Sequence, residues 1–110
     1  MKTAVEINFS ANWNGKLDKP IFTTVRWTDT LYKVGKEYGI YLQGNPFGSA
    51  ILRRITFKRL CDFTDKEIKA DTGKTRIEFM RMMRCWYSGK ACWQGIYSIV
   101  QKLSFVRAKP

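Results

Sequence analysis

Two helix-start signals close together in the chain constrain its fold more than any other feature. Residues 64–67 (TDKE) and 75–78 (TRIE) both have the form of a capping box. In this motif a threonine hydroxyl and a glutamate carboxylate satisfy the free amide groups of a helix start. The first box predicts a short helix over residues 65–70. The second predicts a longer helix to about residue 87, which Ser88 and Gly89 would end.

Strand patterns occupy the chain on both sides of this helical pair. They cover residues 3–9, 21–27, 38–43, 49–60 and 95–107, with loops over 10–20 and 28–37 and a turn cluster at 44–48. In the first pattern Val5, Ile7 and Phe9 share one face, and in the last Leu103 and Phe105 do. Strands, then two helices, then a strand predict an α+β fold, with a small curved sheet and two helices inserted before the last strand.

The composition fits a single folded domain over residues 1–110. Hydrophobic residues make up 45% of the chain and aromatic residues 15%, which is enough apolar material for a core. No linker, repeat or low-complexity segment divides the sequence.

The charge is strongly positive and unevenly spread. The formal net charge is +11, and residues 51–110 contain fourteen Lys and Arg against five Asp and Glu. Such an excess indicates a polyanionic partner, with RNA ahead of DNA and of an anionic membrane. A charged surface that serves solubility alone remains an alternative.

Cysteine and histidine content argues against a metal site. Cys61, Cys85 and Cys92 form no CxxC pair, and the chain has no histidine. An odd number of cysteines without a secretion signal predicts free thiols in a reducing compartment. We therefore expect a cytoplasmic protein without cofactor, metal or membrane span.

Four segments resemble the ASCH domain, a branch of the PUA-like superfamily. They are FTTVRW (22–27), YKVGKEY (32–38), ADTG (70–73) and IYSIVQKLSF (96–105). The resemblance extends over residues 3–106 and is closest to short ASCH-like proteins of large bacteriophages. It implies a β-pseudo-barrel with a cleft beside the strand that carries the T-x-R motif.

The resemblance also implies site residues. PUA-like relatives use this cleft for RNA or modified nucleotides, some ASCH proteins are amidohydrolases of acetylated cytidine, and ribonuclease activity has been attributed to the group. Thr24 matches the nucleophilic threonine of these amidohydrolases and Arg26 their arginine. Asp71 stands where they have a glutamate, and Ile21 where they have a lysine.

Without that lysine and without histidine, no base near Thr24 is evident, so we expect binding rather than catalysis. Thr24, Arg26 and Asp71 are the catalytic set if chemistry is retained. In the alternative, Arg26 pairs with Asp71 as a structural tie and Thr24 fills a strand position.

Eight basic residues are candidates for nucleic-acid contacts. Four lie in the predicted strand 49–60 and four begin or line the longer predicted helix: Arg53, Arg54, Lys58, Arg59, Lys74, Arg76, Arg81 and Arg84. Charged edge-strand protection and a solvated helix face are the alternatives. In the strand, alternation would place Arg53 and Arg59 on one face and Arg54 and Lys58 on the other, unless a bulge intervenes.

Tryptophans supply candidate stacking platforms for bases. Trp13 and Trp93 lie in polar segments and are the candidates for exposure, whereas spacing places Trp27 and Trp86 in the core. The sequence thus predicts an RNA-binding module. The alternatives are a hydrolase acting on a modified nucleoside or RNA, and a phage accessory protein that binds a host protein.

Overall fold

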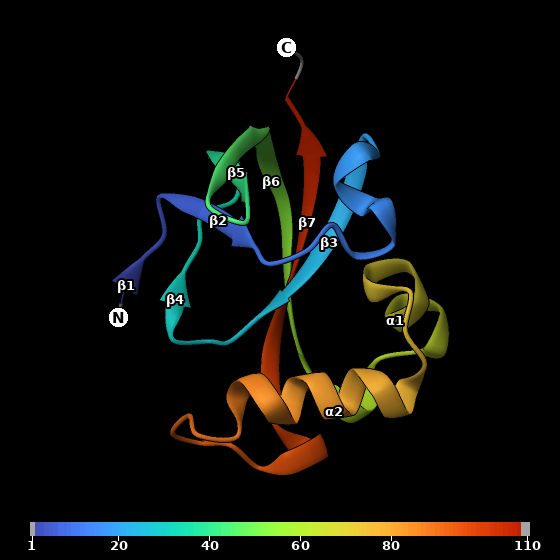
Figure 1. Ribbon diagram of the computed structural model, residues 1–110. Helices are drawn as coiled ribbons and strands as arrows, with labels where there is room; N and C mark the ends of the chain where they lie inside the picture. The colour runs from blue at the N-terminus through green and yellow to red at the C-terminus, as the bar shows by residue number, and fades with distance from the viewer. Residues whose placement is uncertain (1, 109–110) are drawn as a thin grey trace.

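The chain folds into a curled sheet whose last strand follows two helices (Figure 1). The computed structural model describes residues 2–108, and their side chains from residue 4 onward. The elements are β1 (Lys2–Thr3), β2 (Glu6–Phe9), the 3-10 helix η1 (Trp13–Asp18), β3 (Ile21–Arg26), β4 (Thr30–Leu31), β5 (Glu37–Leu42), β6 (Asn45–Arg59), η2 (Leu60–Asp62), α1 (Asp65–Thr72), α2 (Arg76–Tyr87), η3 (Gly95–Tyr97) and β7 (Ile99–Arg107). The predicted α+β class, with two helices before the last strand, is confirmed. None of the described helices has the length and apolar character needed to cross a membrane.

Five strands form the main sheet, in the order β2-β5-β6-β7-β3. β2 pairs with β5 in parallel, and the other neighbours are antiparallel. The sheet curls into a half-barrel, and its two edge strands, β2 and β3, approach each other: Arg26 Nη2 in β3 donates a hydrogen bond to the Asn8 carbonyl in β2 at 3.0 Å. β3 therefore keeps one free edge at the opening of the half-barrel.

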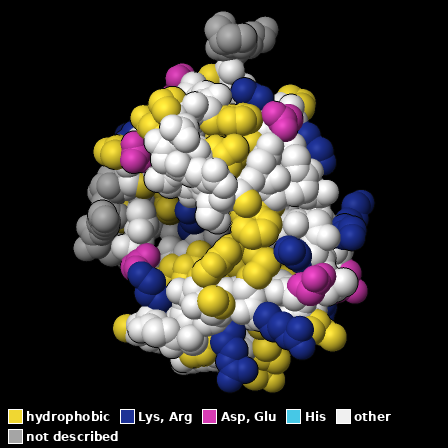
Figure 2. All heavy atoms as spheres, viewed as in Figure 1, with side chains coloured by type: hydrophobic (Ala, Val, Ile, Leu, Met, Phe, Trp, Pro, Cys, Tyr) yellow, Lys and Arg dark blue, Asp and Glu magenta, His cyan; other side chains and the backbone are white. Residues whose placement is uncertain are grey.

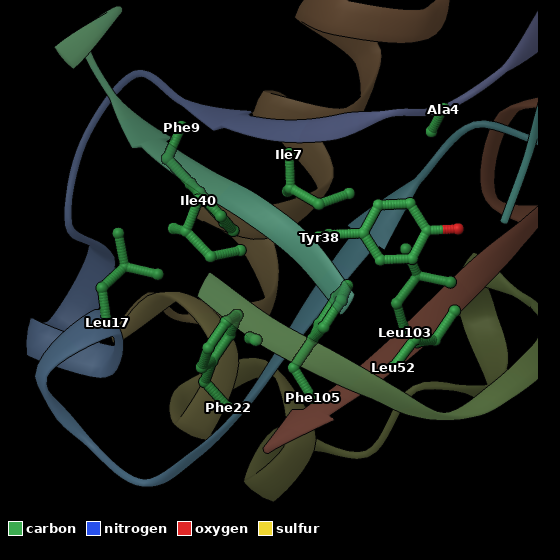
Figure 3. Packing of buried hydrophobic residues seen from close by; sticks show 11 residues of the cluster. Ala4, Ile7, Phe9, Leu17, Phe22, Tyr38, Ile40, Leu52, Leu103 and Phe105 are labelled. Atoms are coloured by element: carbon green, nitrogen blue, oxygen red, sulfur yellow. The ribbon is translucent and has the colours of Figure 1, made fainter. Parts of the chain in front are cut away.

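Two hydrophobic clusters lie on opposite faces of β3 and β7. β3 sends Phe22 to the first cluster and Val25 to the second, while β7 sends Phe105 to the first and Val100 to the second. This follows from the alternation of side chains along a strand. The first cluster fills the inside of the curled sheet (Figure 3), and the second packs α1 and α2 against β3 and β7.

Both capping boxes form as predicted. The Thr64 and Thr75 hydroxyls accept hydrogen bonds from the amides of Glu67 and Glu78, and each glutamate bonds back to the threonine amide. α1 continues two residues beyond the predicted position 70. It ends where Gly73 adopts the left-handed conformation (φ 72°), which glycine reaches without strain.

The prediction that residues 3–9 form one strand with Val5 facing the core is wrong. Val5 is 72% exposed, while Ile7 and Phe9 are buried. The chain bends between β1 and β2 because its first residues pair with β4, with the Ala4 amide donating to the Leu31 carbonyl, whereas β2 pairs with β5. The predicted loop 10–20 contains η1, and β6 begins at Asn45, inside the predicted turn cluster.

Glu67 ties α1 to two strands of the sheet. Its carboxylate accepts hydrogen bonds from Lys58 Nζ on β6 (2.9 Å), from Lys102 Nζ on β7 (2.6 Å) and from the Thr64 amide (3.0 Å). Partial burial alone would raise the pKa of Glu67, but the bonds from Lys102, Thr64 and Lys58 outweigh it and hold the pKa at about 2. The ionised carboxylate is therefore part of the folded state.

Glu67→Gln is expected to destabilise the fold at pH 7 by roughly 1–2 kcal/mol, because two lysines lose their shared anion. The unfolded chain protonates Glu67 near its ordinary pKa of 4.5 and the folded chain only near 2. The stabilisation is thus complete above pH 4.5 and is lost as the pH falls towards 2. Urea unfolding at pH 7 and pH 3 measures both effects.

Glu78→Gln is the matched control, since Glu78 caps α2 but has no lysine partner among the described residues. Glutamine also serves in capping boxes. Glu78→Gln should therefore lower the free energy of unfolding at pH 7 by less than Glu67→Gln does. Equal losses in the two variants would contradict the role assigned to Lys58 and Lys102.

Candidate active site at the free edge of β3

Thr24 and Arg26 face the opening of the half-barrel from β3. Two positions apart on a strand, they emerge on one face. Arg26 Nε donates a hydrogen bond to Thr24 Oγ1 at 3.3 Å, and the guanidinium lies over the Phe9 ring, 4.8 Å from its centroid. Thr24 is buried, so this hydroxyl is shielded from bulk water except through the cavity that it lines.

A buried ion pair lies beside these residues. Lys16 of η1 is 3% exposed, and its Nζ donates to Asp71 Oδ1 of α1 at 2.8 Å and to the Thr23 carbonyl at 2.7 Å. The Thr23 hydroxyl donates to the same Asp71 oxygen at 3.1 Å. Asp71 therefore joins η1, α1 and β3 at one point.

The backbone between β2 and β3 delivers Lys16 to this position. Asn14 and Gly15 adopt the left-handed conformation (φ 56° and 65°) and turn the chain inside η1. The Asn14 side chain donates to the Lys69 carbonyl at the end of α1 (3.2 Å). A Cβ on Gly73 would lie 3.2 Å from the Asn14 Cβ, a tight contact that glycine avoids where η1 approaches α1.

Burial changes the acid–base character of Lys16. Loss of solvation lowers the pKa of its ammonium below the ordinary value, and the Asp71 carboxylate, which favours the charged form, opposes this only in part. Arg26 adds a further lowering through like-charge repulsion. A lysine with a lowered pKa can serve as a proton acceptor, which an exposed lysine at neutral pH cannot.

One cavity of about 250 Å³ brings these groups together. Thr24, Arg26, Lys16 and Asp71 all line it, and α2 closes the other side with Met82, Met83, Trp86 and Tyr87. In Figure 2 hydrophobic side chains gather in the middle of this face and basic ones along its lower part. The volume is just below the usual range for small-molecule sites, which suits a ligand of nucleobase size.

The three predicted catalytic residues thus share one cavity, but two expectations about their partners are wrong. Arg26 does not pair with Asp71, whose partner is Lys16. The absence of a lysine near Thr24, inferred from Ile21, does not hold either. Ile21 is 64% exposed, and Lys16 supplies the amine from a different element.

In the described part of the chain, three of the eight basic residues predicted to contact nucleic acid form ion pairs with acidic residues, and five do not. Lys58 pairs with Glu67, Arg59 with Asp62 and Arg76 with Asp65. Within residues 4–108 the other five make no ion pair: Arg53, Arg54, Lys74, Arg81 and Arg84.

A register shift between Leu52 and Arg54 marks a bulge in β6. Arg53 is the extra residue, so Arg53 and Arg54 together oppose Ser104 of β7. The expected pairing of Arg53 with Arg59 on one face is therefore broken by the bulge, whereas Arg54 and Lys58, which follow it in continuous register, still share a face.

The tryptophans follow the prediction in part. Trp27 is buried and Trp13 and Trp93 are half-buried, but Trp86, expected in the core, is 45% exposed. Trp13 and Trp86 meet edge to face at the cavity, with their ring centroids 6.0 Å apart. Across the described residues, no three His, Cys, Asp or Glu side chains are grouped so that they could hold a metal ion.

Comparison with known proteins adds information on the fold alone. No family model matches the sequence, and no curated protein does. A solved structure from Enterococcus faecalis V583, protein EF3133 with the family description DUF984, is similar over 96% of this chain and 81% of its own, with a TM-score of 0.71 and 12% sequence identity. At this identity the comparison shows that the two proteins share a β-rich half-barrel fold.

Proposed function

We propose that this chain binds RNA or a nucleoside derived from it, and hydrolyses an amide on a modified base held in the β3 cavity. The observation that carries the proposal is the buried Lys16–Asp71 pair in the cavity that Thr24 and Arg26 also line. Lysine, threonine, arginine and carboxylate are the residue types that the ASCH resemblance implies for amidohydrolases. Here the lysine comes from η1.

The backbone of β3 supports a planar, amide-bearing ligand. The Thr23 carbonyl accepts from Lys16, so it points to the free edge of the strand. Residues two apart on a strand present their N–H and C=O groups to the same edge, which places those of Val25 there also. Val25 lines the cavity. Its donor and acceptor match the hydrogen-bonding edge of a nucleobase.

The chemistry follows from the four side chains. Once it has given up its own proton, Lys16 accepts the Thr24 hydroxyl proton, directly or through one water, as Thr24 Oγ1 attacks the acyl carbon. Arg26 Nε, already bonded to Oγ1, stabilises the negative charge that develops on this oxygen. The C–N bond breaks, and the leaving base nitrogen receives the proton from Lys16. Water then hydrolyses the threonine ester, releasing the carboxylic acid and restoring Thr24.

The test is turnover of N4-acetylcytidine by the wild-type protein, followed by chromatography of cytidine and acetate. Product should form at a rate that increases with pH as Lys16 loses its proton. Cytidine itself should bind as product without reaction. The absence of cytidine formation from the acetylated nucleoside, and from RNA that contains it, would overturn the proposal.

A further inference from the structure

α2 presents a second surface on the side away from the β3 cavity. A groove of about 390 Å³ lies between this helix and the segment that contains Trp93 and the start of η3. Apolar side chains form much of its lining and arginines the remainder: Ile77, Met80, Trp93 and Ile96, with Arg76, Arg81 and Arg84. Ile77 and Ile96 are exposed, so the groove is open to a partner.

The groove continues into a basic surface at the junction of α1 and α2. A neighbouring hollow is lined by Asp65, Lys66, Lys69, Lys74, Thr75, Arg76 and Ile77, and it shares Arg76 and Ile77 with the groove. Asp65 is neutralised by Arg76. The other five cations of this surface form no ion pair within residues 4–108: Lys66, Lys69, Lys74, Arg81 and Arg84. We call these five residues the basic strip.

Lys74 connects the basic strip to the β3 cavity. It lines the hollow at the helix junction, and its ammonium lies over the ring of Trp13, 5.7 Å from the centroid. Trp13 in turn lines the β3 cavity. A chain of positive and aromatic side chains thus leads from the cavity to the groove.

We propose that this surface binds an unpaired RNA strand attached to the base in the β3 cavity, with a second base in the groove against Trp93. The proposal rests on the proposed function, because the strand extends from the base held there. The five cations of the basic strip, which form no ion pair within residues 4–108, can bind the phosphates of the strand. A base is matched by the apolar groove and the Trp93 ring, since stacking accepts any base. The preferred substrate is therefore a modified base within a single-stranded RNA, which this surface binds more tightly than the free nucleoside.

Binding of a labelled single-stranded oligoribonucleotide, measured by fluorescence anisotropy against salt, tests the strip. Five neutralised phosphates give a slope of log K against log salt near −3.5, because each contributes about 0.7 in single strands. Arg81→Ala/Arg84→Ala should make the slope shallower by about 1.4 and weaken binding on the order of tenfold. Lys19→Ala/Lys33→Ala removes the same charge from exposed positions outside the basic strip and outside the predicted contacts, and should leave the slope unchanged.

Two further variants test the groove. Trp93→Ala should weaken binding roughly tenfold through lost stacking. Because Trp93 also packs on Trp27 (ring centroids 6.2 Å apart), Ile96→Glu is the second variant. Ile96 is exposed, so this change leaves the fold intact and should weaken binding by a similar factor through repulsion of the phosphates.

The outcomes separate this proposal from the function on which it rests. If the two double variants lose RNA affinity equally, or if Ile96→Glu binds RNA as tightly as the wild type, the groove is not the binding surface, even if the wild type binds RNA. If the affinity for RNA does not change with salt, and a protein that co-purifies with this chain is retained after nuclease treatment, the partner of this surface is an acidic protein and not RNA. Turnover of free N4-acetylcytidine by Arg81→Ala/Arg84→Ala should equal that of the wild type, so loss of the groove and loss of the catalytic proposal are distinguishable.

Discussion

Thr24→Val is expected to lower the turnover number for N4-acetylcytidine on the order of 1,000-fold or more, the scale seen when a nucleophile is removed. Valine keeps the β-branched shape that a strand favours and fills nearly the same buried volume. Only the hydroxyl is lost, together with the hydrogen bond that Arg26 Nε makes to it. The Kd for cytidine should change by less than about threefold, because the hydroxyl is assigned to the reaction and not to binding the base.

Thr24→Ser is the matched control for this experiment. It restores the hydroxyl and the acceptor for Arg26 at the cost of one methyl group, so most of the turnover should return. Single-turnover kinetics and circular dichroism on both variants separate chemistry from folding. Undiminished turnover by Thr24→Val would remove Thr24 as the nucleophile. Equal inactivation of both variants would indicate that packing of the threonine methyl, not its oxygen, is what the cavity needs.

Features determined within a few residues could be predicted from the sequence. The boxes at Thr64 and Thr75 satisfy amides three positions away, so both helix starts were found where they form. Alternation placed Leu103 and Phe105 on the buried face of β7 for the same local reason. The break between β1 and β2 could not be predicted in this way. The two strands pair with different partners, and no local pattern encodes that change, which leaves Val5 exposed.

Lys16 was missed for a long-range reason. The strand that carries Thr24 has no lysine or histidine, and Ile21 stands where the related amidohydrolases have their lysine. Lys16 reaches the site because Asn14 binds the Lys69 carbonyl at the end of α1, a contact between residues far apart in sequence. The available signal was the Asn14-Gly15 pair, a sharp turn that fixes the direction of the next side chain.

Which basic residues are free to bind a partner also depends on long-range contacts. Composition predicted the positive excess, but not that Lys58 and Arg76 are engaged by Glu67 and Asp65. Those pairs form between separate elements, so they follow from the tertiary fold. Trp86 was placed in the core by its spacing, yet it lies at the cavity against Trp13, where α2 and η1 meet.

Lys16→Met is expected to remove turnover and to destabilise the fold by about 3–5 kcal/mol, the usual cost of breaking a buried ion pair. The side chains of Lys16 and Asp71 are 4% and 7% exposed, so the variant leaves an uncompensated carboxylate away from water. For a domain of this size the loss is a large share of the total stability. Urea unfolding at pH 7 measures it.

Lys16→Met/Asp71→Leu separates the two roles of the pair. Replacing both partners by apolar residues removes the buried charges together, so most of the stability lost in Lys16→Met should return. Turnover should stay absent, because no amine is left to accept the Thr24 proton. Recovery of stability without activity assigns the Lys16–Asp71 pair to catalysis. Recovery of both would show that the ion pair serves only to hold η1 against α1, and the base would then have to be sought elsewhere in the cavity.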